Sequence, residues 1–177
     1  MKRIILIISI KYYIFVYSNY KFFMSDEILE NKENFDTQKY FDILSSEDTT
    51  PNKRIEAFIE LSNFFVDKDF SNSFKYASLA SIVTNVPRAD ACCCLADRYL
   101  MSGEYDWAII WYKHAMNNAC KDECDSKYWT YLPLRNLAQI YYLKGQQEEA
   151  LKLIETLLLM RENDEDLLEL KKIFLGK

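Results

Sequence analysis

Two short acidic strings, Asp67-Lys68-Asp69 and Asp164-Glu165-Asp166, have a spacing that could hold a metal ion. An Asp-x-Asp pair can bind a divalent cation through hard oxygen ligands and so fix the diphosphate of a nucleotide. The first string lies in an expected turn between two helices, and the second lies where a helix is expected to begin. Acidic residues are favoured at both places, because they cap free backbone N–H groups and suit the helix dipole. We therefore interpret both strings as helix starts and not as metal sites.

The cysteines and the histidine match neither a metal site nor a catalytic site. Cys120 and Cys124 follow His114, the single histidine of the chain, but a tetrahedral zinc site would need a fourth ligand. One histidine also gives a Ser-His-Asp or Cys-His-Asp site little support. The sequence thus predicts no catalytic, cofactor-binding or metal-binding residue, and a protein that is not an enzyme.

The other three cysteines form the consecutive triplet 92–94 within an apolar stretch, where free cysteine behaves as a small hydrophobic residue. A total of five cysteines does not suit a framework of disulfide pairs. This usage favours a reducing, cytoplasmic setting.

Composition favours long helices and argues against nucleic acid as a partner. The chain has only three glycines and three prolines in 177 residues, too few for the many tight turns of a sandwich or barrel. Its net charge is −5, and residues 1–23 hold four of its 22 basic residues and none of its 27 acidic ones. The remainder is therefore distinctly acidic and shows no basic stripe of the kind that contacts phosphates.

An internal repeat defines the fold. Gly103 stands five residues before Ala108, and Gly145 stands five residues before Ala150. Each glycine follows the same pattern of a leucine, a small residue and a tyrosine. Glycine can end a helix in the left-handed conformation, and small residues let two helix backbones approach closely. The residues expected to pack the repeat are Leu95, Ala96, Tyr99, Gly103, Ala108, Tyr112, Ala115, Leu137, Ala138, Tyr141, Gly145 and Ala150.

This pattern of residue types and spacings resembles the tetratricopeptide repeat (TPR), in which two helices form each hairpin. A weaker copy is centred on Leu61, Ser62, Phe65 and Ser73. The sequence therefore predicts an all-α, TPR-like solenoid of about three hairpins plus a capping helix, within residues 35–177. The expected helices are 35–46, 52–66, 70–84, 88–101, 105–118, 128–143, 147–160 and 164–175.

Residues 50–160 are also similar to the repeat region behind the catalytic domain of some bacterial family 2 glycosyltransferases. The similarity lies in Pro87-Arg88-Ala89 before Cys92-Cys93, in Ala108-Ile109 with Trp111-Tyr112-Lys113, and in Trp129 with Leu132-Pro133. That family places a nucleotide-sugar domain ahead of the repeats, and the residues before 35 are too few to form one. The resemblance implies an alternative function, an accessory or truncated portion of such an enzyme that acts with a catalytic domain supplied elsewhere.

The first 23 residues differ from the rest of the chain. Lys11 interrupts an apolar run that begins at Ile4, and Ser18, Asn19 and Lys21 weaken its end, whereas a membrane span needs about 20 mostly apolar residues. Three interpretations stay open: an N-terminal membrane anchor through residues 4–17, a remnant of a larger parent protein, or an extension that is not normally translated. The acidic body and the free cysteines favour the last two. Residues 24–34 read as a polar linker.

Aromatic residues supply the candidate binding site. Trp107 and Trp111 lie four residues apart, hence on one face of a helix. Tryptophan, tyrosine and arginine dominate the binding energy of protein interfaces. We expect Trp107, Trp111 and Arg135 to contact a protein or peptide in the concave groove of the solenoid. The predicted function is a non-catalytic scaffold for protein–protein interaction, with a glycosyltransferase domain or a second copy of the chain among its potential partners.

Overall fold

The computed structural model describes residues 35–119 and 126–176, and within these residues it contains eight α-helices and no strand. The prediction of an all-α fold is confirmed. The helices are α3 (Thr37–Ser45), α4 (Pro51–Phe65), α5 (Phe70–Ile82), α6 (Ala89–Met101), α7 (Tyr105–Ala119), α8 (Ser126–Leu143), α9 (Gln147–Met160) and α10 (Glu165–Phe174). Their ends agree with the sequence-based boundaries to within two residues.

Residues 39–177 form one compact unit. The apolar and basic segment 1–23, the linker 24–34, and the pair Cys120 and Cys124 lie outside the described residues. Among the helices of the described ranges, none combines the length and the apolar character that crossing a membrane requires.

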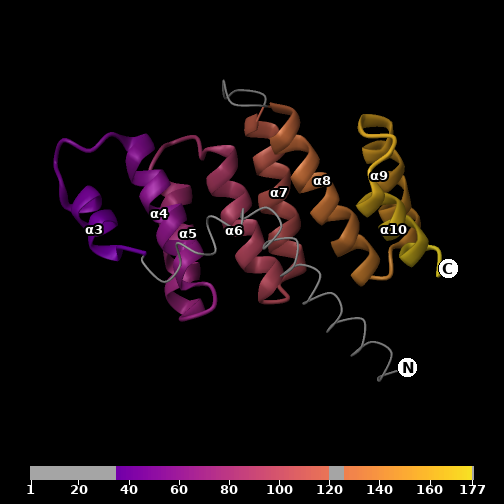
Figure 1. The fold of residues 1–177 in the computed structure, drawn as a ribbon, viewed down its shortest axis with the longest axis horizontal. Helices are drawn as coiled ribbons and strands as arrows, with labels where there is room; N and C mark the ends of the chain where they lie inside the picture. Colours follow the sequence, from indigo (N-terminus) through magenta and orange to yellow (C-terminus); the bar gives the residue numbers. More distant parts are fainter. Residues whose placement is uncertain (1–34, 120–125, 177) are drawn as a thin grey trace. The chain divides into compact units, whose positions relative to one another are not determined.

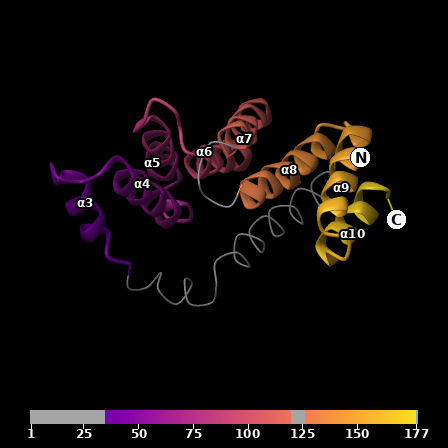
Figure 2. The ribbon, with the colours of Figure 1, turned by 90° about the horizontal axis from the view of Figure 1, so that it is seen from above.

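Successive helices pack in pairs, as Figure 1 shows for α4 with α5, α6 with α7, and α8 with α9. Each pair runs in opposite directions through a short turn and so forms a hairpin. The second helix of each hairpin also packs against the next helix along the chain, α5 against α6, α7 against α8 and α9 against α10. Neighbours in sequence are therefore neighbours in space (Figure 2).

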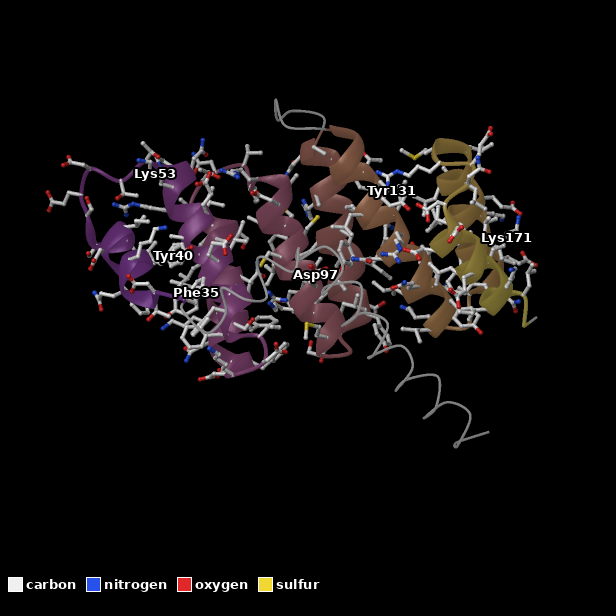
Figure 3. All side chains as sticks on the ribbon, in the orientation of Figure 1. Phe35, Tyr40, Lys53, Asp97, Tyr131 and Lys171 are labelled. Atoms are coloured by element: carbon white, nitrogen blue, oxygen red, sulfur yellow. The ribbon has the colours of Figure 1, made fainter. Side chains whose placement is uncertain are left out.

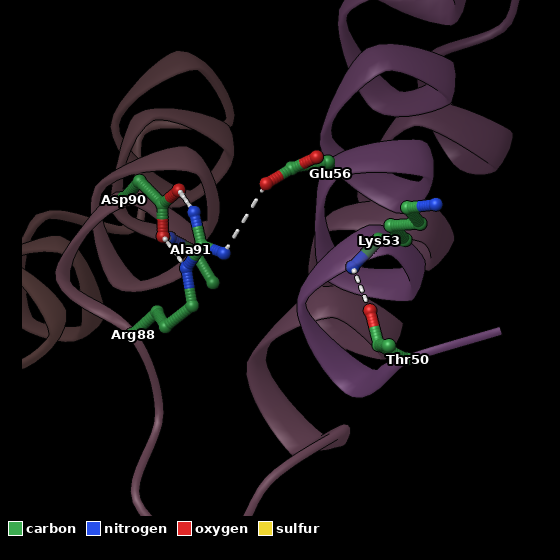
Figure 4. Close-up of polar contacts among 6 residues, drawn as sticks. All are labelled: Thr50, Lys53, Glu56, Arg88, Asp90 and Ala91. Carbon is green, nitrogen blue, oxygen red and sulfur yellow. Dashed lines mark hydrogen bonds and ion pairs between the residues drawn. The ribbon is translucent and has the colours of Figure 1, made fainter.

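Polar side chains cap the starts of α4, α5 and α10, and two of the three caps are aspartates of the acidic strings. Asp69 precedes α5 and accepts a hydrogen bond from the backbone N–H of Asn72 at 3.1 Å. Asp164 precedes α10 and accepts one from the N–H of Leu167 at 3.2 Å. Thr50 does the same for Lys53 at the start of α4 (Figure 4). Each side chain satisfies an N–H group that has no partner inside its helix.

The two internal glycines end α6 and α8 in the same way. Gly103 has φ = 80° and Gly145 has φ = 77°, a left-handed conformation that costs other residues energy. The N–H after each glycine donates to the carbonyl of the repeated tyrosine, from Glu104 to Tyr99 at 2.9 Å and from Gln146 to Tyr141 at 2.8 Å. This hydrogen-bond pattern is the Schellman motif, which satisfies the last free carbonyl groups of a helix.

Small residues lie where the paired helices meet. Ala96, Ala108 and Ala150 are fully buried, as are Ala115, Tyr112 and Ala138, while Leu95 and Leu137 are almost so. Tyr99 and Tyr141 are only half-buried. The second and third hairpins therefore bury alanines in their cores, and their repeated tyrosines lie partly exposed at the edge.

A charged contact joins the first two hairpins. Arg88, just before α6, forms a bidentate pair with Asp90 at 3.1 and 2.5 Å, and its third nitrogen lies 3.5 Å from Glu56 of α4 (Figure 4). The planar guanidinium can serve both carboxylates at once. Arg88 thereby ties the start of α6 to α4.

Replacing Ala108 by tryptophan should unfold or strongly destabilise residues 39–177. Ala108 is fully buried between α6 and α7, and overpacking such a contact costs at least about 1–3 kcal/mol. Asp67→Asn is the control, because Asp67 is exposed in the turn before α5 and should keep wild-type stability. Urea unfolding followed by circular dichroism measures both variants. Full stability of the Ala108 variant would contradict the packing described here.

Candidate functional site

Aromatic and apolar side chains from three helices gather beside the core cluster that contains Leu95, and we call them the aromatic patch. Its members are Phe74 of α5, Tyr99 of α6, and Trp107, Ile110, Trp111 and His114 of α7. The ring centroids of Phe74 and Tyr99 are 4.9 Å apart and edge-to-face, and those of Tyr99 and Trp107 are 6.0 Å apart and stacked. Trp111 and His114 lie 5.7 Å apart. These distances lie in the range of favourable ring contacts.

The helical repeat places the patch beside the core. Trp107, Trp111 and His114 are spaced four and three residues apart, so they share a face of α7 next to the buried stripe of Ala108 and Tyr112. Trp111 is partly buried against the core cluster that contains Leu95. Trp107 remains 53% exposed and Ile110 43% exposed. The core therefore holds one edge of the patch rigidly, while the other edge is open to solvent.

Of the three residues predicted to bind a partner, two share a face of α7 and the third is buried on α8. Trp107 and Trp111 contact α6 and the cluster around Leu95. Arg135 of α8 is only 4% exposed, and its guanidinium lies 3.8 Å from the carboxylate of Asp166 on α10. The expectation that Arg135 contacts a partner in a groove therefore disagrees with its burial. Its charge faces the acidic start of α10 instead.

A half-buried polar cluster links α6, α7 and α8. The hydroxyl of Tyr112 donates to the carboxylate of Asp97. The side-chain amide of Asn136 donates to the Tyr112 hydroxyl at 2.8 Å and to Asp97 at 3.4 Å. Burial raises the pKa of Asp97 above its usual range, although the Tyr112 hydrogen bond and the charge of Arg98 act in the opposite direction. Figure 3 labels Asp97 on α6.

Arg98, the buried arginine of α6, is not among the residues that the sequence analysis predicts to be important. Arg98 donates to the Ser62 hydroxyl at 3.1 Å and to the side-chain oxygen of Asn63 at 2.7 Å. Ser62 and Ser73 also donate to each other's backbone carbonyls, at 2.8 and 2.7 Å. A signal was present, because Arg98 lies seven residues after Ala91 and three after Leu95, in the buried stripe of its helix.

Each acidic string contributes one aspartate that caps the start of a helix. Both oxygens of Asp69 accept hydrogen bonds from Asn72, one from its backbone and one from its side chain. One oxygen of Asp164 caps α10, and the other accepts from the Tyr131 hydroxyl at 2.6 Å. Burial and this hydrogen bond raise the pKa of Tyr131 to about 12. In the described ranges no three His, Cys, Asp or Glu side chains are grouped so that they could hold a metal ion.

Two comparisons with known proteins give no functional assignment for this chain. No protein-family model matches the chain, and no curated protein matches it. The resemblance to TPR repeats and to glycosyltransferase repeat regions therefore depends on the residues quoted for it.

Asp97→Asn should stabilise the fold at neutral pH. An acid whose pKa is raised by folding binds protons more tightly when folded, so its ionisation weakens the fold as pH rises through that raised pKa. Asparagine keeps an oxygen that can accept from Tyr112 but carries no charge to bury. The difference in unfolding free energy between variant and wild type should therefore shrink as pH falls through the Asp97 pKa. Urea titrations at several pH values measure it, and a gap that widens on acidification would contradict the placement of Asp97.

Proposed function

We propose that this protein is a non-catalytic protein–protein interaction module of the TPR type, and that its aromatic patch contacts a protein or peptide partner. The observation that carries the proposal is Trp107, which is 53% exposed although it stacks on Tyr99. A large ring that is held in place and still open to solvent can bind with little loss of conformational freedom.

The architecture supports the TPR type. Three consecutive hairpins pack against one another, and two of them share the glycine turn, the tyrosine carbonyl that the turn satisfies, and the buried alanine that follows. Stacked hairpins of this kind expose extended faces made of several helices, which is how repeat proteins bind their partners. The aromatic patch is such a face, because it draws on α5, α6 and α7.

The composition of the patch supports a protein partner. Tryptophan and tyrosine are the residues most enriched at binding hot spots, where they lie inside a rim of polar groups. Here Asp106 precedes Trp107 and forms an ion pair with Lys144, just after α8, while Lys113 is exposed farther along α7. An aromatic centre with mixed charges beside it suits a polypeptide better than a uniformly charged polymer such as nucleic acid.

The chemistry of the buried thiols and of the capping carboxylates supports a non-catalytic role and a cytoplasmic setting. Burial raises the pKa of both the Cys93 and the Cys94 thiol. A nucleophilic cysteine needs the opposite shift, because the thiolate is the reactive form. Asp69 and Asp164 cap helices through hydrogen bonds that a metal ion would have to displace. Free cysteines in the core are typical of proteins in a reducing compartment.

Selection from a random peptide library tests the proposal. Peptides enriched on the wild-type chain should bind Trp107→Ala at least about tenfold more weakly, because loss of a hot-spot ring costs about 2 kcal/mol or more. Isothermal titration measures the affinities. Ile82→Ala is the matched control, because Ile82 is 71% exposed on α5 outside the patch, and it should leave binding unchanged. Equal affinity for both variants, or no enriched peptide, would refute the role of the patch.

A further inference from the structure

Trp107 has one face of its ring covered and the other open. Tyr99 covers the first face, because the two rings stack with their centroids 6.0 Å apart and an interplanar angle of 26°. None of the described aromatic rings lies against the outer face, and the Trp107 side chain is 53% exposed. The contact with Tyr99 holds the indole in place. The face of an aromatic ring is electronegative and attracts a cation that lies over it, and tryptophan does so most strongly.

The charge next to this open face is acidic. Glu104 and Asp106 are the only charged residues within four positions of Trp107 in either direction along the chain. Glu104 immediately precedes α7, and its carbonyl accepts a hydrogen bond from the N–H of Ala108 at 3.0 Å. Glu104 therefore lies one turn before Trp107, and residues three apart are neighbours on a helix surface.

Only one of these two acids is already paired. Asp106 forms an ion pair with Lys144. Glu104 is exposed, and within residues 35–119 and 126–176 no hydrogen bond or ion pair reaches its carboxylate. Lys113 is the next base along α7, but it follows Trp107 by six residues, which places it about 9 Å along the helix axis and on another side of the helix. The carboxylate of Glu104 is thus available to a group from outside the chain.

The basic residues of the neighbouring elements are directed elsewhere. The ammonium group of Lys75 on α5 lies 5.8 Å from the ring centroid of Tyr76, and that of Lys68, in the turn before α5, lies 3.5 Å from the ring centroid of Phe64. Arg98 on α6 is 1% exposed and donates its hydrogen bonds to side chains of α4. None of these three bases faces the open side of the indole.

The chain as a whole also favours a basic partner, and the geometry favours arginine. All 27 acidic residues, but only 18 of the 22 basic ones, lie after residue 23. An acidic surface attracts basic partners and selects against acidic ones. The guanidinium group is planar, so it can stack on an aromatic ring and donate two hydrogen bonds to a carboxylate at the same time. The ammonium group of lysine is a compact point charge and cannot do both.

We propose that an arginine of the partner polypeptide stacks on the open face of Trp107 and pairs with Glu104. This inference rests on the proposed function and deepens it, because it names the residue of the partner that the aromatic patch recognises. The guanidinium plane covers the indole, and its edge donates to the Glu104 carboxylate. Because Glu104 lies on one side of Trp107 only, the pair also fixes the direction in which the bound segment enters the patch.

The composition of peptides selected from the random library gives the first test. Peptides enriched on the wild-type chain should carry arginine at one aligned position, at least about threefold more often than lysine, because only arginine can both stack and pair. The same selection on Glu104→Gln should lose this preference. Enriched peptides that depend on Trp107 but lack a basic residue would overturn this proposal and leave the proposed function intact. If no peptide is enriched, the proposed function fails and this proposal fails with it.

A double-mutant cycle tests the pairing with Glu104 directly. One enriched peptide is made with arginine or with citrulline, which has the same flat shape but no charge. On the wild-type chain the citrulline form should bind about tenfold more weakly, and on Glu104→Gln only about threefold, because the ion pair is then absent from both forms. Isothermal titration measures the four affinities.

Glu148→Gln is the matched control for this cycle. Glu148 is exposed in the first turn of α9, so the substitution removes the same charge from another helix start and should keep the tenfold ratio. A ratio that is equal in Glu104→Gln and in the wild type would show that Glu104 does not contact the arginine. A ratio that falls equally in Glu148→Gln would show only the effect of net charge, and it would overturn the pairing as well.

Discussion

Close contact between helix backbones is the constraint on which the rest of this structure depends. At Ala96, Ala108 and Ala150 the side chain is a single methyl group and is fully buried, so paired helices can approach as closely as their backbones allow. That closeness sets the position of everything carried by the hairpins. Trp111 reaches the core cluster around Leu95 only because α6 and α7 lie so near each other, and Trp107 then stacks on Tyr99.

The turns allow the same close contact between paired helices to recur in successive hairpins. In two hairpins a left-handed glycine lets the chain reverse within a few residues, and the N–H that follows it returns to the carbonyl of Tyr99 or Tyr141. The first hairpin achieves a comparable turn without glycine, through hydrogen bonds from Lys68 and Asp69 to the Phe65 carbonyl and through the Asp69 cap. The same geometry can thus be built from two local chemistries, which explains why the first repeat is weaker in sequence.

Local signals in the sequence were sufficient to predict the helices. The polar contacts between helices could not be predicted in this way. Helix boundaries follow from glycine, proline and capping acids, each of which acts within a few residues of itself. The pairing of Tyr112 with Asp97 and Asn136 joins three helices, and the approach of Arg135 to Asp166 joins α8 to α10. Such contacts depend on the rotation of each helix about its axis, which spacing along the chain does not determine. For this reason the spacing of Trp107 and Trp111 predicted their shared face of α7, whereas the burial of Arg135 could not be read from its place in the sequence.

Helices of this fold pack mainly against their neighbours in the sequence, and this determines how local stability varies along the chain. In the described residues α3 has no buried side chain, whereas α6 is buried over most of its length and packs with α4, α5, α7 and α8. Opening of a repeat array begins where an element has fewest neighbours, so we expect amide protons of α3 to exchange with solvent long before those of α6. By the same argument we expect the middle hairpin, which carries the two tryptophans, to open last.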